Sequence, residues 1–174
     1  MKKIVLVILA IVLVSSLTFA EGEAKSGQFG LQTGLVFTGV GLGFVGDIGA
    51  KYMITDSIAI RAALGLLNIS SSGNSTTLYD LGAGFEYHFA GKGGVSPYAG
   101  AEISYSGASF SAGGDTPSEF GLDGVFGGEY FFSSNFSWAG EARLGFVFDD
   151  DGAGTKTNFI GTLGFATFLT WYIN

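Results

Sequence analysis

Residues Ser57–Leu67 have the sequence SIAIRAALGLL, and they decide which class of protein this is. The segment has the composition of a β-strand, yet a charged residue, Arg61, lies in its middle. A strand turns alternate side chains to opposite faces, so Arg61 shares one face with Ala59, Ala63 and Gly65. Both faces are otherwise apolar or small, and neither offers a guanidinium group a water-facing surface. The fold therefore has to supply an enclosed polar space for Arg61.

The same one-sided alternation recurs along the chain. In each segment one face carries large apolar residues, with aromatic residues towards the ends, and the other face carries glycine and isolated charges. A water-soluble sandwich would need a polar face rich in lysine, threonine, serine and glutamate, which these segments lack. The two-residue period predicts eight strands: Gln28–Phe37, Leu42–Met53, Ile58–Leu67, Thr77–Phe89, Pro97–Tyr105, Phe120–Phe132, Phe136–Phe148 and Asn158–Ile173.

This pattern fits a barrel whose apolar side chains face lipid, whose aromatic residues mark the two interfaces and whose polar side chains fill the interior. A closed barrel leaves no unpaired strand edge in lipid, and tilted strands of about 9–11 residues cross a bilayer. We therefore predict an all-β fold, an eight-stranded antiparallel up-and-down transmembrane β-barrel. Eight strands enclose a space that side chains just fill. Glycines on the inner face would leave room there for larger polar side chains.

The first 20 residues, MKKIVLVILAIVLVSSLTFA, have the pattern of a secretory signal peptide. Lys2 and Lys3 form a positive region, an apolar run follows, and small residues precede a cleavage site after Ala20. The apolar run is short for a membrane span of about 20 residues, which disfavours an uncleaved anchor. We predict a signal peptide at 1–20 and a single barrel domain at 21–174.

Charge and cysteine content exclude several classes of protein. After Ala20 the chain holds 15 Asp+Glu residues and, without Lys2 and Lys3, six basic residues, which gives a formal charge of −9. Such an acidic chain does not suit nucleic-acid binding, which requires a basic face. The absence of cysteine excludes disulfides, thiolate metal sites and lipidation at the cleavage site.

Turn lengths predict the orientation of the barrel. Short turns belong on the periplasmic side and long loops outside. The short segments Thr55–Ser57 and Ser133–Asn135, with the intermediate segment Ala90–Ser96, are therefore assigned to the periplasmic side. Three longer polar segments are expected to be outer loops: Asn68–Thr77, Ser106–Glu119 and Asp149–Thr157. The TGVG segment at Thr38–Gly41 suits a two-residue outer turn.

Charged residues on the inner faces are the most informative set. They could line a pore or a proton path, or they could form a plug of ion pairs that fixes the register of the strands. Buried charges persist only when they are paired, and in so narrow a barrel we favour the plug. The predicted inward charges are Asp47, Lys51, Arg61, Asp80, Glu86, Glu102, Asp123, Glu129, Glu141 and Arg143.

Arg61 should have specific partners in this set. The short turn between their strands places Lys51 directly opposite Arg61, and two opposed like charges destabilise a strand pair. Aligning Ile58 with Phe89 brings Glu86 opposite Arg61 on its other side. We therefore predict a row Lys51–Arg61–Glu86 in the periplasmic half of the interior.

Other motifs do not indicate catalysis or cofactors. The Gly41–Gly46 segment, GLGFVG, matches GxGxxG but lies between a turn and a strand, which does not suit a nucleotide. The Asp149–Gly152 segment lacks calcium-loop spacing and reads as a solvated acidic loop. His88, the single histidine, points inward at the periplasmic end, whereas a hydrolase barrel would need a histidine beside a serine nucleophile and a carboxylate at the outer rim or lipid face. We expect no enzymatic activity, cofactor or metal.

From about Gly27 onward, the chain resembles the small eight-stranded outer-membrane β-barrels of the OmpX, OmpW and opacity-protein type. The resemblance rests on the signal segment and on IGAKYMITDSIAIRAALGL, PYAGAEISY and GTLGFATFLTWYI. It implies that the last strand carries a signal for the barrel-assembly machinery. The chain ends in Asn174, where a terminal phenylalanine is usual. The residues matched to the signal are Phe165, Leu169, Trp171 and Ile173.

These observations predict a non-enzymatic outer-membrane barrel, exported by a cleaved signal peptide, with a structural or surface-interaction role through its outer loops. The expected partners are outer-membrane lipids and, during biogenesis, the assembly machinery; the barrel is expected to be a monomer. An OmpW-like narrow channel or binding cavity for small apolar molecules is the alternative. A lipid-modifying enzyme and a secreted soluble ligand-binding barrel are less favoured.

Overall fold

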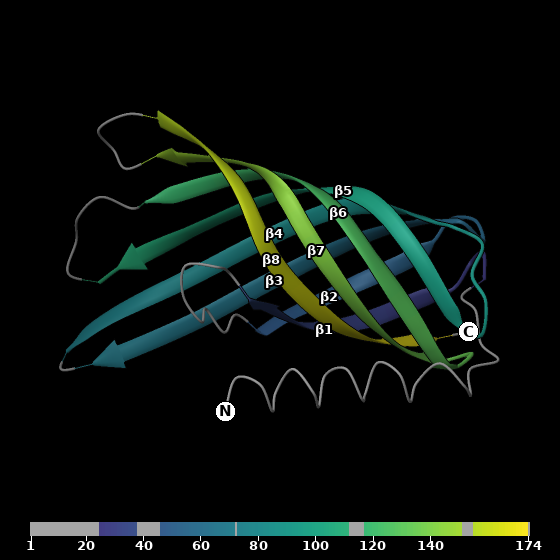
Figure 1. Cartoon of the computed structure of the whole chain (residues 1–174). Helices are drawn as coiled ribbons and strands as arrows, with labels where there is room; N and C mark the ends of the chain where they lie inside the picture. Colours follow the sequence, from purple (N-terminus) through teal and green to yellow (C-terminus); the bar gives the residue numbers. More distant parts are fainter. Residues whose placement is uncertain (1–24, 38–45, 72, 112–116, 151–154, 174) are drawn as a thin grey trace, which may run out of the picture.

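The computed structural model describes residues 25–37, 46–71, 73–111, 117–150 and 155–173. In these ranges the chain forms a closed antiparallel barrel, in which each strand pairs with its neighbours in sequence and the last strand closes against the first (Figure 1). The predicted fold class is confirmed. The described part of the chain contains no helix with the length and hydropathy of a membrane span. The strands are β1 (Phe29–Phe37), β2 (Gly46–Met53), β3 (Ile58–Ser71), β4 (Asn74–His88), β5 (Val95–Phe110), β6 (Ser118–Ser133), β7 (Phe136–Asp150) and β8 (Thr155–Ile173).

The barrel wall turns its apolar side chains outward. On β4, Phe85 and Tyr87 are exposed, whereas the alternate residues Glu86 and His88 are buried. The same division holds on β3, where Ile60 is exposed and Arg61 is buried. A surface this apolar is suited to lipid rather than to water. Alternation of side chains along the strands therefore gives the faces that the sequence predicts.

Aromatic residues mark both ends of the apolar belt. At one end the rings of Tyr79 and Tyr105 lie 6.1 Å apart, as do those of Phe120 and Phe148. At the other end of β4 the chain reaches Phe89, ten residues after Tyr79. With a rise of about 3.3 Å per residue and a tilt of about 40°, this spacing makes the belt roughly 25 Å tall. That height matches the hydrocarbon layer of a membrane.

The three long outer segments are not loops over their whole length, and this part of the prediction is wrong. Strand β3 runs to Ser71 and β4 begins at Asn74, so most of the predicted Asn68–Thr77 loop is paired strand. Serine, threonine and asparagine at alternate positions suit a strand that stands in water as well as they suit a loop. The Asn68 side-chain amide donates a hydrogen bond to Thr77 Oγ1 across this pair at 2.7 Å.

The other two outer hairpins are extended in the same way. Strand β5 continues to Phe110, β6 starts at Ser118, β7 ends at Asp150 and β8 starts at Thr155. All three hairpins project from one end of the barrel in Figure 1, opposite the end where β8 finishes. The predicted Thr38–Gly41 turn and the start of the predicted Leu42–Met53 strand lie outside the described residues.

The turns predicted to lie on the periplasmic side are formed, and their side stays a prediction. The β2–β3 turn is closed by a hydrogen bond from Ile54 N to Ile58 O at 2.8 Å, and Thr55 Oγ1 accepts the Ile58 N–H at 2.9 Å. In the β4–β5 turn Gly93 and Gly94 have φ of 66° and 75°, a backbone region that side chains other than glycine rarely adopt.

The register of β3 and β4 differs from the prediction by two residues. Ile58 pairs with Tyr87 rather than with Phe89, and Arg61 therefore pairs with Gly84. The β4 strand ends at His88, whose N–H donates to Ser57 O, while Phe89 N–H donates to Pro97 O on β5. A shift of two residues leaves every side chain on its predicted face, so alternation alone could not distinguish the two registers.

Candidate functional site in the barrel interior

Strand pairing brings two cations to the same level of the interior. Lys51 on β2 pairs directly with Arg61 on β3, as predicted, and Arg61 pairs with Gly84 on β4. Gly84 in turn pairs with Glu102 on β5. Because Gly84 has no side chain, Arg61 reaches across it to Glu102, with Nη2 2.7 Å from Oε2. The absence of a side chain at Gly84 thus lets two charged residues on non-adjacent strands form an ion pair.

Lys51 is held between two carboxylates. Its Nζ lies 2.5 Å from Glu86 Oε2 and 2.7 Å from Glu129 Oε2, and its side chain is 1% exposed. The ammonium also lies 5.4 Å from the ring centre of Tyr98, within the range of a cation–π contact. Both carboxylates are as buried as the lysine. This pairing offsets the repulsion between Lys51 and Arg61.

Arg61 is shared by three carboxylates. Besides Glu102, its Nη1 lies 2.9 Å from Glu86 Oε1 and 2.6 Å from Glu141 Oε2. The predicted pairing of Arg61 with Glu86 is present even though Glu86 pairs with Ala59 in the ladder. Arg61 Nε is the one buried side-chain polar atom without a hydrogen-bond partner among the described residues. These three carboxylates form the enclosed polar space that Arg61 requires in the segment SIAIRAALGLL.

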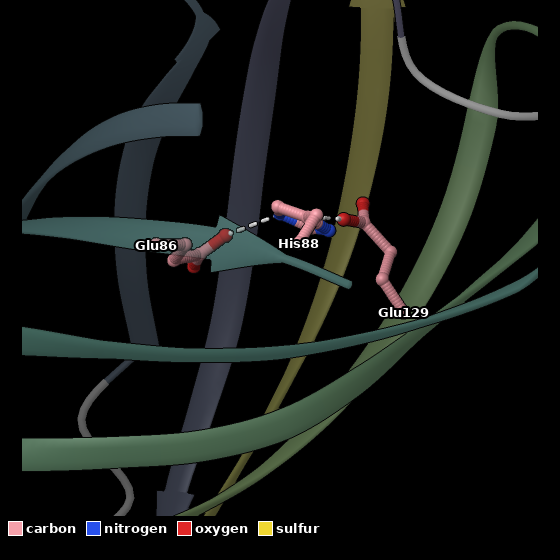
Figure 2. A group of neighbouring side chains, drawn as sticks. All are labelled: Glu86, His88 and Glu129. Carbon is pink, nitrogen blue, oxygen red and sulfur yellow. Dashed lines mark hydrogen bonds and ion pairs between the residues drawn. The ribbon is translucent and has the colours of Figure 1, made fainter. Parts of the chain in front are cut away.

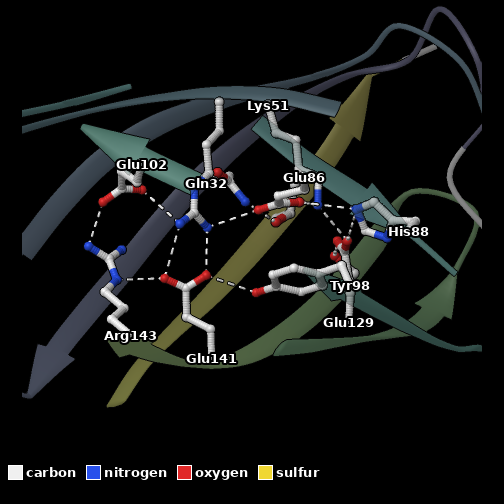
Figure 3. Close-up of polar contacts among 12 residues, drawn as sticks. Gln32, Lys51, Glu86, His88, Tyr98, Glu102, Glu129, Glu141 and Arg143 are labelled. Atoms are coloured by element: carbon white, nitrogen blue, oxygen red, sulfur yellow. Dashed lines mark hydrogen bonds and ion pairs between the residues drawn. The ribbon is translucent and has the colours of Figure 1, made fainter. Parts of the chain in front are cut away.

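Arg143 on β7 completes the group of ion pairs. Its Nη1 contacts Glu102 Oε1 at 2.5 Å, and its Nε lies 2.7 Å from Glu141 Oε1. Figure 3 shows Arg143 and Glu141, both on β7, meeting Glu102 of β5. Three cations and four carboxylates are linked in this way, and we call them the interior charge network: Lys51, Arg61, Arg143, Glu86, Glu102, Glu129 and Glu141.

Hydroxyl groups that the sequence analysis did not single out satisfy the remaining carboxylate oxygens. Tyr172 and Ser137 both donate to Glu129 Oε1, at 2.8 and 2.5 Å. Tyr98 donates to Glu141 Oε2 at 3.0 Å. All three lie at alternate inward positions of their strands, which is the signal that could have indicated them. Together these bonds make the network a packed polar core.

His88 lies at the edge of the network nearest the β4–β5 turn. Its Nε2 is 3.0 Å from Glu86 Oε2 and 4.0 Å from Glu129 Oε2 (Figure 2). Its Nδ1 is 2.9 Å from Ser96 Oγ. Glu86, His88 and Glu129 offer ligand atoms within 4.8 Å of one another, as a metal site would require. The Lys51 ammonium already contacts both carboxylates. We therefore assign the two carboxylates to ion pairing with Lys51 rather than to a metal.

The structure does not bring every predicted inward charge into the network. Asp123 pairs with Glu102 in the ladder but joins none of the ion pairs found among the described residues. Asp47 and Asp80 both pair with Gly65, further toward the outer end; the side chain of Asp47 is not described. The predicted assembly residues Phe165, Leu169, Trp171 and Ile173 are all exposed on the outer face of β8, and their role stays a prediction.

Comparison with known proteins identifies the family. The model for the outer membrane protein beta-barrel domain matches residues 6–166. The chain belongs to this outer-membrane β-barrel family. The family is located in the bacterial outer membrane, which agrees with the apolar belt and its aromatic borders. No curated protein is significantly similar to the chain.

Solved structures of similar shape are also known, and the first of them below supports the fold alone. The outer membrane protein OprG from Pseudomonas aeruginosa has a TM-score of 0.51 at 10% identity, over 86% of this chain and 93% of that one. The N-terminal β-barrel domain of P. aeruginosa OprF gives 0.48 at 14% identity, over 85% and 98%. Neisserial surface protein A gives 0.43 at 24% identity, over 83% and 92%. At these identities no site residue can be transferred to this outer-membrane barrel.

Proposed function

We propose that the protein is a structural outer-membrane barrel with a closed lumen, acting on its surroundings through the hairpins that stand above the membrane. The closed interior charge network carries this proposal. The Lys51, Glu86 and Glu129 side chains are at most 1% exposed, and that of Arg61 is 5% exposed. A buried cation with partners on several strands is costly to move, because each lost contact leaves a charge unpaired. These ion pairs favour a plug over a conducting path.

The outer hairpins support a role in surface interaction. Outward-facing residues change from apolar to polar beyond Leu66 and Tyr79, where Asn68 and Thr77 follow on the same face. Strands of 14 to 16 residues, such as β3 and β5, are longer than the 9–11 residues that a membrane crossing needs. The additional residues raise the hairpins out of the lipid, and exposed connections of this kind commonly carry binding functions.

Conductance is the direct test of the closed lumen. We expect the native barrel to give no discrete current steps in planar bilayers at neutral pH. The double variant Arg61→Ser, Glu141→Ser removes one cation and one carboxylate from the centre of the network, and we expect it to pass more current. Discrete steps from the native barrel would contradict the proposal and favour a narrow channel.

A binding cavity for small apolar molecules is the second candidate. It is favoured by Leu67 and Leu78, which pair with one another and lie on the inward side of β3 and β4 near the outer end. Their position would give the outer mouth an apolar lining. Native conductance that small apolar solutes block would support this candidate over the closed barrel.

Export is proposed to include cleavage after Ala20. The pattern of residues 1–20 supports it. Mass spectrometry of the protein from outer membranes should therefore give a chain starting at Glu21. A chain that retains Met1 in that fraction would contradict the cleavage while leaving the barrel unaffected.

We propose that the protein is a monomer and that its partners are outer-membrane lipids and, during assembly, the barrel-assembly machinery. The exposed side chains of β8, with Trp171 at 61%, support contact with both. Site-specific crosslinking from position 171 during assembly would detect the machinery, and crosslinking to a second copy of the chain would contradict the monomer.

A further inference from the structure

A chain of hydrogen bonds links a serine, the histidine and a glutamate at the periplasmic mouth of the barrel. Ser96 Oγ lies 2.9 Å from His88 Nδ1, and His88 Nε2 lies 3.0 Å from Glu86 Oε2. A carboxylate only accepts hydrogen bonds, so His88 donates its Nε2–H to Glu86. His88 Nδ1 is then the acceptor for the Ser96 hydroxyl. This is the order of contacts that activates a serine nucleophile.

The serine and histidine open onto a cavity. A space of ≈460 Å³ lies at this end of the barrel, and Ser96 and His88 both line it. Met53 and Phe131, each 1% exposed, contribute apolar side chains to its wall, and Lys25 lines it as well. Asp56 and Ser57 also line it, so the wall is mixed polar and apolar, and the volume is in the range of small-molecule sites.

We propose that Ser96, His88 and Glu86 form a nucleophile, a general base and a positioning residue that hydrolyse esters of small acyl groups at the periplasmic mouth. The inference goes beyond the structural role and does not depend on whether the lumen conducts. It departs from the expectation of no enzymatic activity. That expectation arose because the sequence did not show which serine lies beside His88.

The reaction balances with water as the second substrate. Ser96 Oγ attacks the ester carbonyl carbon while its proton passes to His88 Nδ1. The tetrahedral intermediate then releases the alcohol, which takes the proton from His88, and leaves an ester on Ser96. Water attacks this ester, giving its proton to His88, and the proton returns to Ser96 as the carboxylic acid leaves. In this proposal Lys25, which lines the same cavity, stabilises the oxyanion.

The surrounding contacts favour this role for Glu86. Its carboxylate is held by Lys51 at 2.5 Å and by Arg61 at 2.9 Å, so its position is fixed from two sides. A fixed carboxylate keeps the imidazole in one tautomer and one orientation, which is the task of the acid in a serine triad. Ser137, by contrast, donates to Glu129 and is fully buried, so it is not a second nucleophile of this kind.

The test uses the full-length mature barrel in detergent micelles, with a fluorophosphonate probe and 4-nitrophenyl acetate. We expect covalent labelling of Ser96, mapped by mass spectrometry, and release of nitrophenolate. Ser96→Ala should abolish both. His88→Gln should slow labelling about 100-fold or more, the usual contribution of a general base. Ser134→Ala, which changes an exposed serine in the β6–β7 turn at the same end, should label as the native protein does.

Folding and positioning need separate readouts. All rates are compared per folded barrel, measured by the mobility shift between unheated and boiled samples in SDS gels. Glu86→Gln should lower the maximal labelling rate without changing the probe concentration at half-saturation, a split that a loosened fold would not give. The proposal is overturned if folded native protein is not labelled at Ser96, if His88→Gln labels at the native rate, or if nitrophenolate release equals that of Ser96→Ala.

Discussion

Replacing Arg61 with methionine should lower the free energy of unfolding by about 3–5 kcal/mol, the usual cost of removing one partner from a buried charge group. Arg61 contacts Glu86, Glu102 and Glu141, all within 2.9 Å. Without it, four buried carboxylates would be left to Lys51 and Arg143. Urea titration of the barrel in lipid vesicles measures the change. Arg61→Lys keeps the charge but cannot contact three carboxylates at once, so its loss should be intermediate.

The double variant Arg61→Met, Glu141→Met isolates the pairing itself. We expect it to lose less stability than the sum of the two single variants, with a coupling of about 1–3 kcal/mol. Lys92→Met, which changes an exposed basic residue in the β4–β5 turn, should cost no more than about 0.5 kcal/mol. Coupling near zero would show that the ion pair at 2.6 Å contributes nothing specific.

Ala83→Arg should destabilise the barrel by about 2–4 kcal/mol in the same titration. Ala83 is exposed on the outward face of β4, midway between Tyr79 and Tyr87, so it should lie near the centre of the lipid. An arginine there must leave its charge in hydrocarbon or distort the bilayer. The effect tests which way the wall faces.

Ser75→Arg is the matched control for this variant. Ser75 lies on the same face of the same strand, beyond Tyr79 toward the outer end. Its substitution should cost no more than about 1 kcal/mol, because the charge stays in water. Equal losses at positions 75 and 83 would mean that the outer face of β4 does not cross lipid as described.

The faces of the strands could be predicted from the sequence because they depend only on alternation. The two-residue period places Arg61 inside and Ile60 outside whichever register the strands adopt. The height of each residue along the barrel axis depends on the register of the strands. The predicted register was wrong, because it aligned Ile58 with Phe89 instead of Tyr87. Hairpin lengths were also underestimated, because Asn68 and Ser70 read equally well as strand or loop.

Contacts across the lumen could not be predicted from the pairing of neighbouring strands. Arg61 and Glu141 lie 80 residues apart on strands that are not neighbours, and they meet only because the barrel closes. The serine beside His88 left a detectable signal: once His88 pairs with Tyr98, Ser96 follows two residues away on the same face. Serine is too common in such turns for that signal to stand out alone.

The interior charge network has a consequence for how the chain reaches its final state. Its members come from six successive strands, β2 to β7, and two of its bonds join residues 78 and 80 positions apart. Contacts so distant in sequence form late and slowly, after long segments of chain have been brought together.

An intermediate that contained only β1 to β4 would hold Lys51, Arg61 and Glu86 of the network but none of the carboxylates on β5, β6 and β7. Of the network it would carry two cations for one acid, beside an open edge in lipid, where both unpaired charges and unpaired strand edges are costly. The charges inside the finished barrel therefore disfavour insertion strand by strand, and they favour a closure in which the last four strands arrive almost together.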